Sequence, residues 1–266
     1  YEGDEILAEL HFENEGEAII CNCKTKVCKE ILRDKIKDLS DSPDVIDEIL
    51  IELDVLKEGQ NIDAIAIRVV APSEYFIKNS LVDDEFIGQL EDAQSKAPLH
   101  VSVVLAELKA LKSKFTLPIY AISDSAFHAT KPKKAQFYAI DTELAQKNEI
   151  KRFGYHGLSV GSISHLMKEN DIANEKVIVC HLGSGCSISA LESGKSVDNS
   201  MGYSPLEGVA MATRSGNIDF SAAIALKNAL NISLSETEKY LNKQAGLLGL
   251  SGISGDLRDV IESAES

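Results

Sequence analysis

The stretch that decides the fold covers residues 176–220, KVIVCHLGSGCSISALESGKSVDNSMGYSPLEGVAMATRSGNIDF. Its apolar start, residues 177–180, predicts a strand, and residues 187–191 predict a second strand directly after it. Residues 181–185 are therefore expected to form a tight hairpin turn, where glycine lets backbone N–H groups approach an anion. Arg214 follows in a polar loop, and its guanidinium suits a phosphate or a carboxylate. A glycine turn followed by an arginine indicates phosphate chemistry.

Segments on both sides of this stretch alternate between strand and helix patterns. Residues 5–23 alternate in the manner of a hairpin, and residues 27–56 show the apolar spacing of two helices broken at a proline. Residues 62–70 and 117–123 are nearly continuous apolar runs, which predict strands buried on both faces. Residues 247–259 are glycine-rich and are expected to be irregular. Further helices are predicted over residues 83–94, 101–112, 159–169, 218–229 and 233–245. This alternation predicts an α/β fold.

The size and charge of the chain restrict its class. Its 266 residues, 44% hydrophobic and 26% charged, have the composition of a soluble globular protein with room for two domains. We expect a boundary after residue 126, which gives lobes over residues 1–126 and 127–266. A net charge of −15 argues against nucleic acid or an acidic membrane as a partner. No apolar run approaches the roughly 18 residues of a membrane span, and the acidic start lacks the layout of a signal peptide, so a cytoplasmic location is expected.

The five cysteines do not form a metal-binding pattern. Cys21 and Cys23 are not followed by a second pair at the spacing of a zinc site, while Cys180 and Cys186 flank the glycine turn. Reduced cysteines are therefore expected rather than a metal site.

Three polar residues follow or end predicted strands, namely Arg68, Asp124 and His181. In open α/β folds, ligands bind beyond the carboxyl ends of the strands. Taken alone, Asp124 also fits a helix cap and His181 also fits a core histidine with satisfied hydrogen bonds. An arginine at the end of an apolar strand is costly unless it has a partner, so the three together indicate a cleft.

Two other motif interpretations fit less well. Gly157-Leu158-Ser159-Val160-Gly161 matches the G-x-S-x-G nucleophile pattern, but that pattern needs a preceding strand, and residues 153–156 are too short and glycine-broken to supply one. Gly183-Ser184-Gly185 is neither a Walker loop, because no Gly-Lys-Ser/Thr follows, nor a Rossmann fingerprint, because the third glycine is absent. By spacing alone, the turn indicates only an anion near the backbone.

Eight ordered segments resemble the acetate kinase family. They are AIRVV (66–70), APLH (97–100), SDSAFHATKP (123–132), RFGYHGLS (152–159), HLGSGCSI (181–188), GKSVDNSMGYSPLEG (194–208), TRSGNID (213–219) and SGDLRD (254–259). The resemblance implies the two-lobed actin-like ATPase fold, which is ribonuclease H-like, with ATP and Mg²⁺ and a homodimer. It also implies that this chain is truncated at both ends, with both lobes incomplete, no metal ligand of its own and little or no activity by itself.

The resemblance implies a role for individual residues. Arg68 matches the arginine that holds the substrate carboxylate, and Asp124 matches an active-site acid. His156 and Arg214 match the pair that stabilises the transferring phosphoryl group. The pocket for the methyl group of acetate matches Val70, Leu99, Tyr155 and Pro205. The ATP-binding segments match His181, Leu182, Gly183, Ser184 and Gly185, and Asp256, Leu257 and Arg258.

Physical reasoning agrees with these roles. Transfer of the γ-phosphoryl group of ATP to acetate builds charge on the phosphoryl oxygens, which His156 and Arg214 are expected to meet. Arg68 would bring two repelling anions together. A carboxylate nucleophile has no proton to lose, so Asp124 is expected to orient Arg214 rather than act as a base.

Departures from the family pattern leave two alternatives open. Ala71-Pro72-Ser73 stands where the family usually continues H-G-G after its R-V-V segment, Ser184 replaces an asparagine, and Tyr155 replaces a phenylalanine and adds a hydroxyl. A changed acid pocket favours a propionate or butyrate kinase. The changes at Ala71-Pro72-Ser73 and Ser184 also leave open a homologue that binds nucleotide and has lost the reaction.

Overall fold

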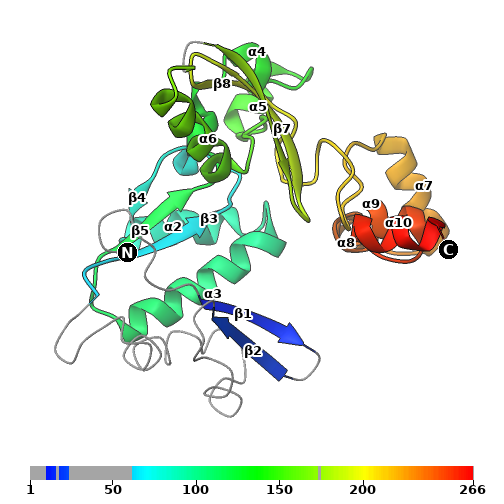
Figure 1. The fold of residues 1–266 in the computed structure, drawn as a ribbon, viewed down its shortest axis with the longest axis horizontal. Coiled ribbons are helices and arrows are strands. Elements are labelled where there is room, and N and C mark those ends of the chain that lie inside the picture. Colours follow the sequence, from blue (N-terminus) through cyan, green and yellow to red (C-terminus); the bar gives the residue numbers. More distant parts are fainter. Residues whose placement is uncertain (1–9, 16–17, 24–61, 173–174, 266) are drawn as a thin grey trace. The chain divides into compact units, whose positions relative to one another are not determined.

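The computed structural model describes residues 10–15, 18–23, 62–172 and 175–265, and the side chains of residues 62–97, 101–172 and 175–265 (Figure 1). The two helices predicted within residues 27–56 lie outside the described residues. The chain divides into two compact units, Tyr1–Ala66 with Ser102–Tyr120, and Ile67–Val101 with Ala121–Ser266. The predicted lobe boundary after residue 126 stays a prediction. None of the helices in the described part is long and apolar enough to cross a membrane.

The first unit contains the hairpin that residues 5–23 predict. Strands β1 (Leu10–Glu15) and β2 (Ala18–Cys23) pair in antiparallel register, with Leu10 opposite Cys23 and Glu15 opposite Ala18. Period-2 alternation therefore identified this element correctly.

A three-stranded sheet has the order β3-β5-β4, with β3 at Ile65–Val69, β4 at Ser80–Leu81 and β5 at Ile119–Ser123. Hydrogen bonds join Ile65 N to Pro118 O and Asp124 N to Val69 O, so β3 and β5 run in the same direction. Their carboxyl ends therefore meet at one edge of the sheet. Burial alternates along both strands, so the prediction that they are buried on both faces is wrong; period 2 leaves every second side chain of β3 on an exposed face.

Two helices follow the predicted pattern, with one shift. Asp83 caps α2 (Asp84–Ala93) through its side chain, which accepts from Phe86 N. Helix α3 (Pro98–Lys114) begins three residues before the predicted start at residue 101. Proline at the first helical position lacks only an N–H that has no partner there, and its ring presets the helical φ angle, so Pro98 begins the helix rather than preventing it. The buried face of α3 consists of Val101, Val104, Leu105, Leu108 and Leu111.

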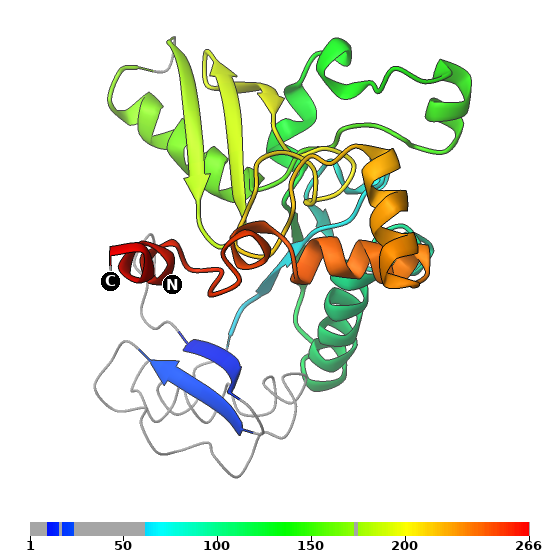
Figure 2. The ribbon, with the colours of Figure 1, turned by 90° about the vertical axis from the view of Figure 1, so that its right-hand side faces the viewer.

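Residues 176–199, the first part of the stretch that decides the fold, form an antiparallel meander of three strands (Figure 2). These are β6 (Lys176–Leu182), β7 (Cys186–Glu192) and β8 (Lys195–Asn199). Helix α6 (Gly157–Glu169) packs on β6. Val160 and Met167 of the helix form a core cluster with Val179 of β6 and Leu191 of β7. The other short helices of this region are η2 (Glu74–Phe76), η3 (Ala126–Thr130), α4 (Lys133–Gln136) and α5 (Thr142–Lys147).

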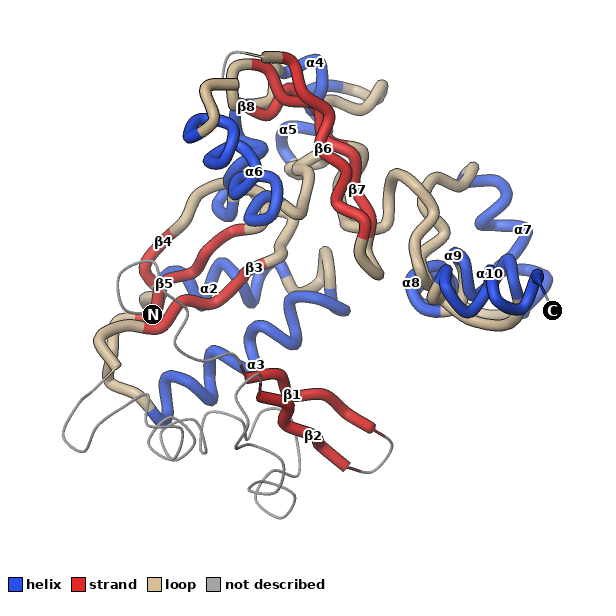
Figure 3. The backbone as a smooth tube through the Cα atoms, in the orientation of Figure 1, coloured by secondary structure: helices blue, strands red, loops and turns tan. Residues whose placement is uncertain are grey.

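The last helices are α7 (Phe220–Leu230), α8 (Leu234–Lys243), α9 (Gly246–Ser251) and α10 (Leu257–Glu265) (Figure 3). Ser233 and Glu236 form a capping box at the start of α8, as the predicted helix over residues 233–245 requires. The prediction that residues 247–259 are irregular is wrong for residues 247–251, which belong to α9, and for residues 257–259, which begin α10, and it holds for residues 252–256 between them. Backbone contacts explain α9: Leu247 N and Leu248 N donate to the carbonyls of Met211 and Ala212, which compensates for its glycines.

Candidate active site

One pocket, of about 380 Å³, gathers most of the residues selected from the sequence. All of its lining residues belong to the second unit. Eleven of the candidates line it, together with Leu158 and Ser159, and they are Arg68, Val70, Asp124, Tyr155, His156, His181, Gly183, Ser184, Gly185, Pro205 and Arg214.

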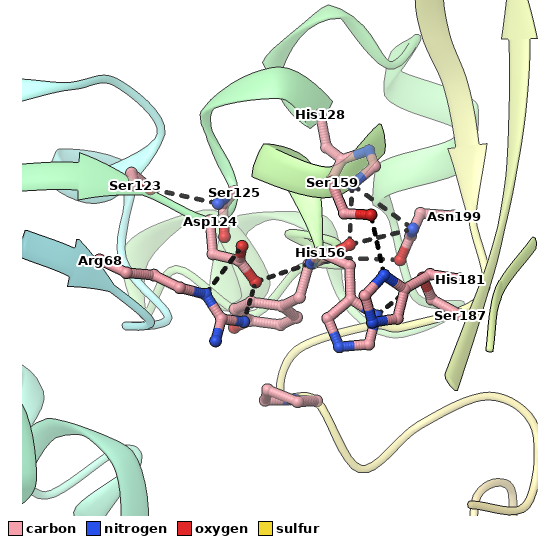
Figure 4. Close-up of polar contacts among 12 residues, drawn as sticks. Arg68, Ser123, Asp124, Ser125, His128, His156, Ser159, His181, Ser187 and Asn199 are labelled. Carbon is pink, nitrogen blue, oxygen red and sulfur yellow. Dashed lines mark hydrogen bonds and ion pairs between the residues drawn. The ribbon is translucent and has the colours of Figure 1, made fainter. Parts of the chain in front are cut away.

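The carboxyl ends of β3 and β5 place Arg68 beside Asp124 (Figure 4). Arg68 donates from Nε to Asp124 Oδ1 at 3.1 Å and from Nη2 to Oδ2 at 2.8 Å, which is a bidentate ion pair. The Asp124 side chain is 1% exposed and that of Arg68 is 53% exposed. The arginine therefore presents the rest of its guanidinium to solvent and the pocket, while the carboxylate that holds it is buried.

Asp124 also fixes the backbone of the next candidate. Its Oδ2 accepts from His156 N at 2.7 Å, and its carbonyl accepts from Gly157 N at 2.8 Å. His156 has φ 61° and ψ 25°, a left-handed conformation that is costly for a residue other than glycine. At Gly157 a Cβ would collide with the Asp124 carbonyl, so only glycine allows this close approach.

The ionisation of Asp124 follows from these contacts. Burial by itself raises the pKa of Asp124, but the hydrogen bond and charge of Arg68, with the His156 N–H, lower it below its ordinary value. Asp124 is therefore a carboxylate at neutral pH. The expectation that it orients Arg214 is wrong, because both of its oxygens are engaged by Arg68 and His156 N.

The His156 ring is held from two sides. Its Nδ1 lies 3.0 Å from Ser187 Oγ, and the His181 ring stacks on it with a centroid distance of 4.0 Å. Burial first, then the neighbouring His181, lowers the pKa of His156 to about 4, with Arg68 and Arg214 acting in the same direction. The ring is therefore neutral at pH 7.

His181 lies within β6 rather than in the turn after it, because the hairpin pairing continues to Leu182 opposite Cys186. His181 Nδ1 lies 2.9 Å from Ser159 Oγ, so the serine of the G-x-S-x-G match contacts a histidine. No strand leads directly into α6, which follows α5, and in the described residues no carboxylate bonds the other ring nitrogen of His181. A serine hydrolase needs both features, and the pair instead fixes the His181 ring.

The three-residue turn brings Gly185 between His156 and Arg214. A Cβ at Gly185 would lie 3.2 Å from His156 Nε2 and 3.4 Å from Arg214 Nη1, so glycine lets both side chains face the same space. The turn also receives a hydrogen bond from Ala212 N to Ser184 O at 3.0 Å. Arg214 Nη1 donates to Pro205 O at 3.2 Å. The loop that carries Arg214 is thus fixed to the turn.

The apolar wall of the pocket is part of a core cluster. Val70, Phe153, Tyr155, Met201 and Met211 pack together, and Tyr155 is fully buried. The Tyr155 hydroxyl donates to Tyr203 O at 2.6 Å, so the hydroxyl that replaces a phenylalanine hydrogen is satisfied by the backbone. Leu99 lies in α3, and its side chain is outside the described residues.

Four candidates whose side chains the structure describes are not part of this pocket. Leu182 belongs to β6 and is 78% exposed. Asp256, Leu257 and Arg258 lie at the start of α10, where Arg258 donates to Asp256 through Nε at 3.0 Å and Nη2 at 2.5 Å. Within the described residues, no group of three or more His, Cys, Asp or Glu side chains is arranged to hold a metal ion.

The sequence interpretation missed the buried polar residues that hydrogen-bond the backbone of the segment carrying Tyr155 and His156. His128 is buried, with Nε2 2.9 Å from Tyr155 O and Nδ1 2.8 Å from Ser196 Oγ. Asn199 Oδ1 accepts from Tyr155 N at 3.4 Å, and Lys131 Nζ donates to Arg152 O at 3.0 Å. These polar residues lie inside the family-like segments, but only their burial distinguishes them from surface residues, and burial was not readable from their spacing.

Comparisons with known proteins show the family of this chain. The family model described as the acetokinase family matches residues 5–266. A curated acetate kinase from Caldanaerobacter subterraneus subsp. tengcongensis is 40% identical over 241 residues, which are 88% of this chain and 60% of that protein. The chain therefore spans less than two thirds of the length of this relative.

Two solved structures share the fold. A propionate kinase from Francisella tularensis subsp. tularensis has a TM-score of 0.82 at 35% identity, covering 93% of this chain and 63% of that one. The acetate kinase of Porphyromonas gingivalis has a TM-score of 0.83 at 28% identity, covering 98% of this chain and 67% of that one. Acetate and propionate kinases have the actin-like ATPase fold, so the predicted fold class is confirmed. Because the family model matches nearly the whole chain and solved kinases share its fold, this chain belongs to the acetokinase family.

Proposed function

We propose that this chain carries the acid-binding and phosphoryl-facing part of an acetate kinase, which transfers the γ-phosphoryl group of ATP reversibly to acetate and forms acetyl phosphate and ADP. The observation that supports this most strongly is the convergence of Arg68, His156 and Arg214 on one pocket beside the glycine turn. Asp124 links the first two through its side chain. An anion-binding cation and two further donors at one place suit a reaction between two anions.

In this proposal, Arg68 binds the acid. Its Nε and Nη2 are used by Asp124, which leaves Nη1 for the carboxylate of the substrate. Val70, Tyr155 and Pro205 line the same pocket and give the methyl group an apolar wall. Holding acetate against the phosphate group of ATP replaces a collision between repelling anions with a fixed approach.

The transfer step needs charge stabilisation rather than covalent help. A carboxylate oxygen of acetate forms a bond to the γ-phosphorus, and the bond from that phosphorus to the β–γ bridging oxygen breaks, so ADP leaves with the electron pair. His156 Nε2 and Arg214 Nη1 face the space beside Gly185, where the phosphoryl oxygens would lie. These fixed donors would stabilise the charge that develops on those oxygens.

ATP is the second substrate in this proposal. The backbone of the turn Gly183–Gly185 suits its phosphates, and His181 and Leu182 lead into that turn. Mg²⁺ would enter with the nucleotide and neutralise phosphate charge; no ligand for it is assigned to a described residue. The adenosine contacts assigned to Asp256, Leu257 and Arg258 stay predictions, as do the homodimer, the cytoplasmic location and the inactivity of residues 1–266 alone.

The choice of acid is the second question about this pocket. The curated acetate kinase relative is 40% identical, and the structure named a propionate kinase is 35% identical. The altered loop does not reach the pocket: Ala71 and Ser73 are buried, and Ser73 Oγ accepts from Tyr75 N and donates to Glu149. Tyr155 lines the pocket, is fully buried and packs in the core cluster. These observations favour acetate over larger acids.

The experiment compares kcat/KM for acetate, propionate and butyrate, with ATP, in the protein at its full natural length. We expect acetate to be preferred, with a loss of about 10- to 200-fold for each added methylene. A preference for propionate or butyrate would correct the substrate. ATP binding without any acid-dependent turnover would favour the inactive homologue instead.

A further inference from the structure

The His156 imidazole faces the proposed phosphoryl position with one nitrogen and contacts a buried serine with the other. His156 Nδ1 lies 3.0 Å from Ser187 Oγ, and Ser187 is fully buried on β7 (Figure 4). The opposite ring nitrogen, Nε2, is the atom that a Cβ on Gly185 would approach to 3.2 Å. Ser187 therefore touches the end of the imidazole that the substrates do not reach.

The His156 ring carries only one proton at neutral pH. The titratable and charged groups that face it are His181 from β6, Asp124 after β5, Arg68 from β3, and Arg214 from the loop. Burial, His181 and the two arginines disfavour the charged ring more than Asp124 favours it, so the pKa of His156 falls to about 4. A neutral imidazole has one N–H and one acceptor nitrogen, so the position of that proton decides whether Nε2 donates or accepts.

The Ser187 hydroxyl decides this position. Within the described residues, Ser187 Oγ has no side-chain hydrogen bond other than that to His156. If His156 Nδ1 carried the proton, the Ser187 O–H would be buried without an acceptor, which is the costlier arrangement. The hydroxyl therefore donates to Nδ1, and the ring proton lies on Nε2.

A second histidine of the same unit shows the same arrangement. His128 Nε2 lies 2.9 Å from the Tyr155 carbonyl, which only accepts, so Nε2 of that neutral ring carries the proton. Its Nδ1 then accepts from Ser196 Oγ at 2.8 Å. At His128 the Tyr155 carbonyl fixes the tautomer, and a buried serine again donates to Nδ1 of a neutral ring.

We propose that Ser187 holds His156 in its Nε2–H tautomer, so that a neutral histidine donates a hydrogen bond to the transferring phosphoryl group. Ser187 is a positioning residue in this reaction, because it acts through His156 and does not line the pocket. The tautomer follows from the contacts alone, and the donation to phosphoryl oxygen rests on the proposed function.

The direct test is ¹⁵N NMR of the imidazole nitrogens in the histidine-labelled protein at its full natural length, with His156 assigned from the signals lost in His156→Gln. At pH 7 we expect a protonated, pyrrole-type Nε2 and an unprotonated, pyridine-type Nδ1. Ser187→Ala should convert these signals to the averaged values of two exchanging tautomers. Ser164→Ala removes another buried serine hydroxyl, bonded to Gly194 O, and should leave them unchanged. A protonated Nδ1 or a charged ring in the wild type would overturn the proposal.

The second test is kinetic and uses the protein at its full natural length. Ser187→Ala should lower kcat by about 3- to 10-fold, the effect of one neutral hydrogen bond, with little change in the KM for acetate. In a His156→Ala background the same substitution should lower kcat no further, because its effect passes through the ring. An unchanged kcat in Ser187→Ala, or equal losses in both backgrounds, would overturn the positioning role. Absence of turnover in the wild type would refute the proposed function and leave the NMR result to decide the tautomer.

Discussion

At the scale of single residues, Asp124 connects the two halves of the proposed chemistry. One carboxylate oxygen helps to orient Arg68, which is proposed to bind the acid, and the other holds the backbone of His156 in a left-handed conformation. The group is 1% exposed and ionised, and its charge is matched by the Arg68 guanidinium. Asp124 therefore positions two other residues and has no proton to accept from a carboxylate substrate.

Asp124→Asn tests this positioning role. The asparagine side chain keeps one acceptor, for His156 N, and turns its NH2 group toward Arg68 Nε, which removes the ion pair and sets two donors against each other. We expect kcat/KM for the acid to fall by about 10- to 100-fold, the range for hydrogen bonds to charged groups. Steady-state kinetics with varied acetate measures the change.

The matched control is the next residue along the chain. Ser125 is also buried, and its Oγ has no hydrogen-bond partner among the residues that the structure describes. Ser125→Ala should leave kcat/KM close to the wild-type value. If Asp124→Asn behaved like Ser125→Ala, Asp124 would have no positioning role.

At the scale of elements, a buried polar network joins η3 and β8 to the segment that carries Tyr155 and His156. His128 from η3 bonds the Tyr155 carbonyl, and Asn199 from β8 bonds both that carbonyl and Tyr155 N. Gly154 has φ 82°, and a Cβ there would press on His128 and Asn199. The strained segment is thus held by satisfied polar groups rather than by apolar packing alone.

This network predicts sensitivity to acid. Burial is the main cause that lowers the pKa of His128 to about 4, from an ordinary value of 6.5. Below pH 6.5 the unfolded chain takes up a proton that the folded chain does not, so the free energy of unfolding falls as the pH drops from 6.5 to 4. His128 alone should contribute a loss of about 2 kcal/mol between pH 7 and pH 5. Urea unfolding at the two pH values measures it.

His128→Gln should weaken this dependence on pH. The exposed His165, which pairs with Glu169, offers the control: His165→Gln should keep the wild-type difference between pH 7 and pH 5. Equal losses of stability in His128→Gln and the wild type would show that His128 does not cause the acid sensitivity.

Elements with a strong hydrophobic period or a short apolar run were predictable from the sequence, and the others were not. The hairpin β1–β2 and helix α2 follow such periods, and strands β5 and β6 were found from short apolar runs. Strand β8, KSVDN, was missed because its inward residues, Ser196 and Asn199, are polar and bond the His128 network instead of an apolar core. Helix α9 was missed because its glycines disfavour a helix locally, and backbone contacts with residues 211–212 override that preference.

The same distinction applies to the candidate site. Parallel strand ends explain why Arg68 and Asp124 could be expected near one another from the sequence. The partner of Asp124 could not be predicted, because two arginines were available and only the geometry shows that Arg68 occupies both carboxylate oxygens. No sequence pattern distinguishes Ser187, because its proposed role depends on the contact of its hydroxyl with His156 Nδ1.

At the scale of the whole molecule, an acidic chain concentrates cations where they meet anions. The net charge is −15, yet the pocket contains Arg68 and Arg214 within the second unit. Fixed positive groups in a partly enclosed site act on a bound anion more strongly than surface charges do. The proposed reaction depends on that local excess of positive charge, and Arg214 is the cation closest to the phosphoryl position beside Gly185.

The measurement that tests the central claim most directly is acetyl phosphate formation from ATP and acetate, compared between the wild type and Arg214→Ala at full natural length. The wild type should turn over, and Arg214→Ala should lose about 10²- to 10³-fold in kcat, as removal of a transition-state donor does. Lys176→Ala, which removes an exposed cation outside the pocket, should change nothing. Equal kcat values for Arg214→Ala and the wild type, or a wild type that forms no acetyl phosphate, would contradict the account.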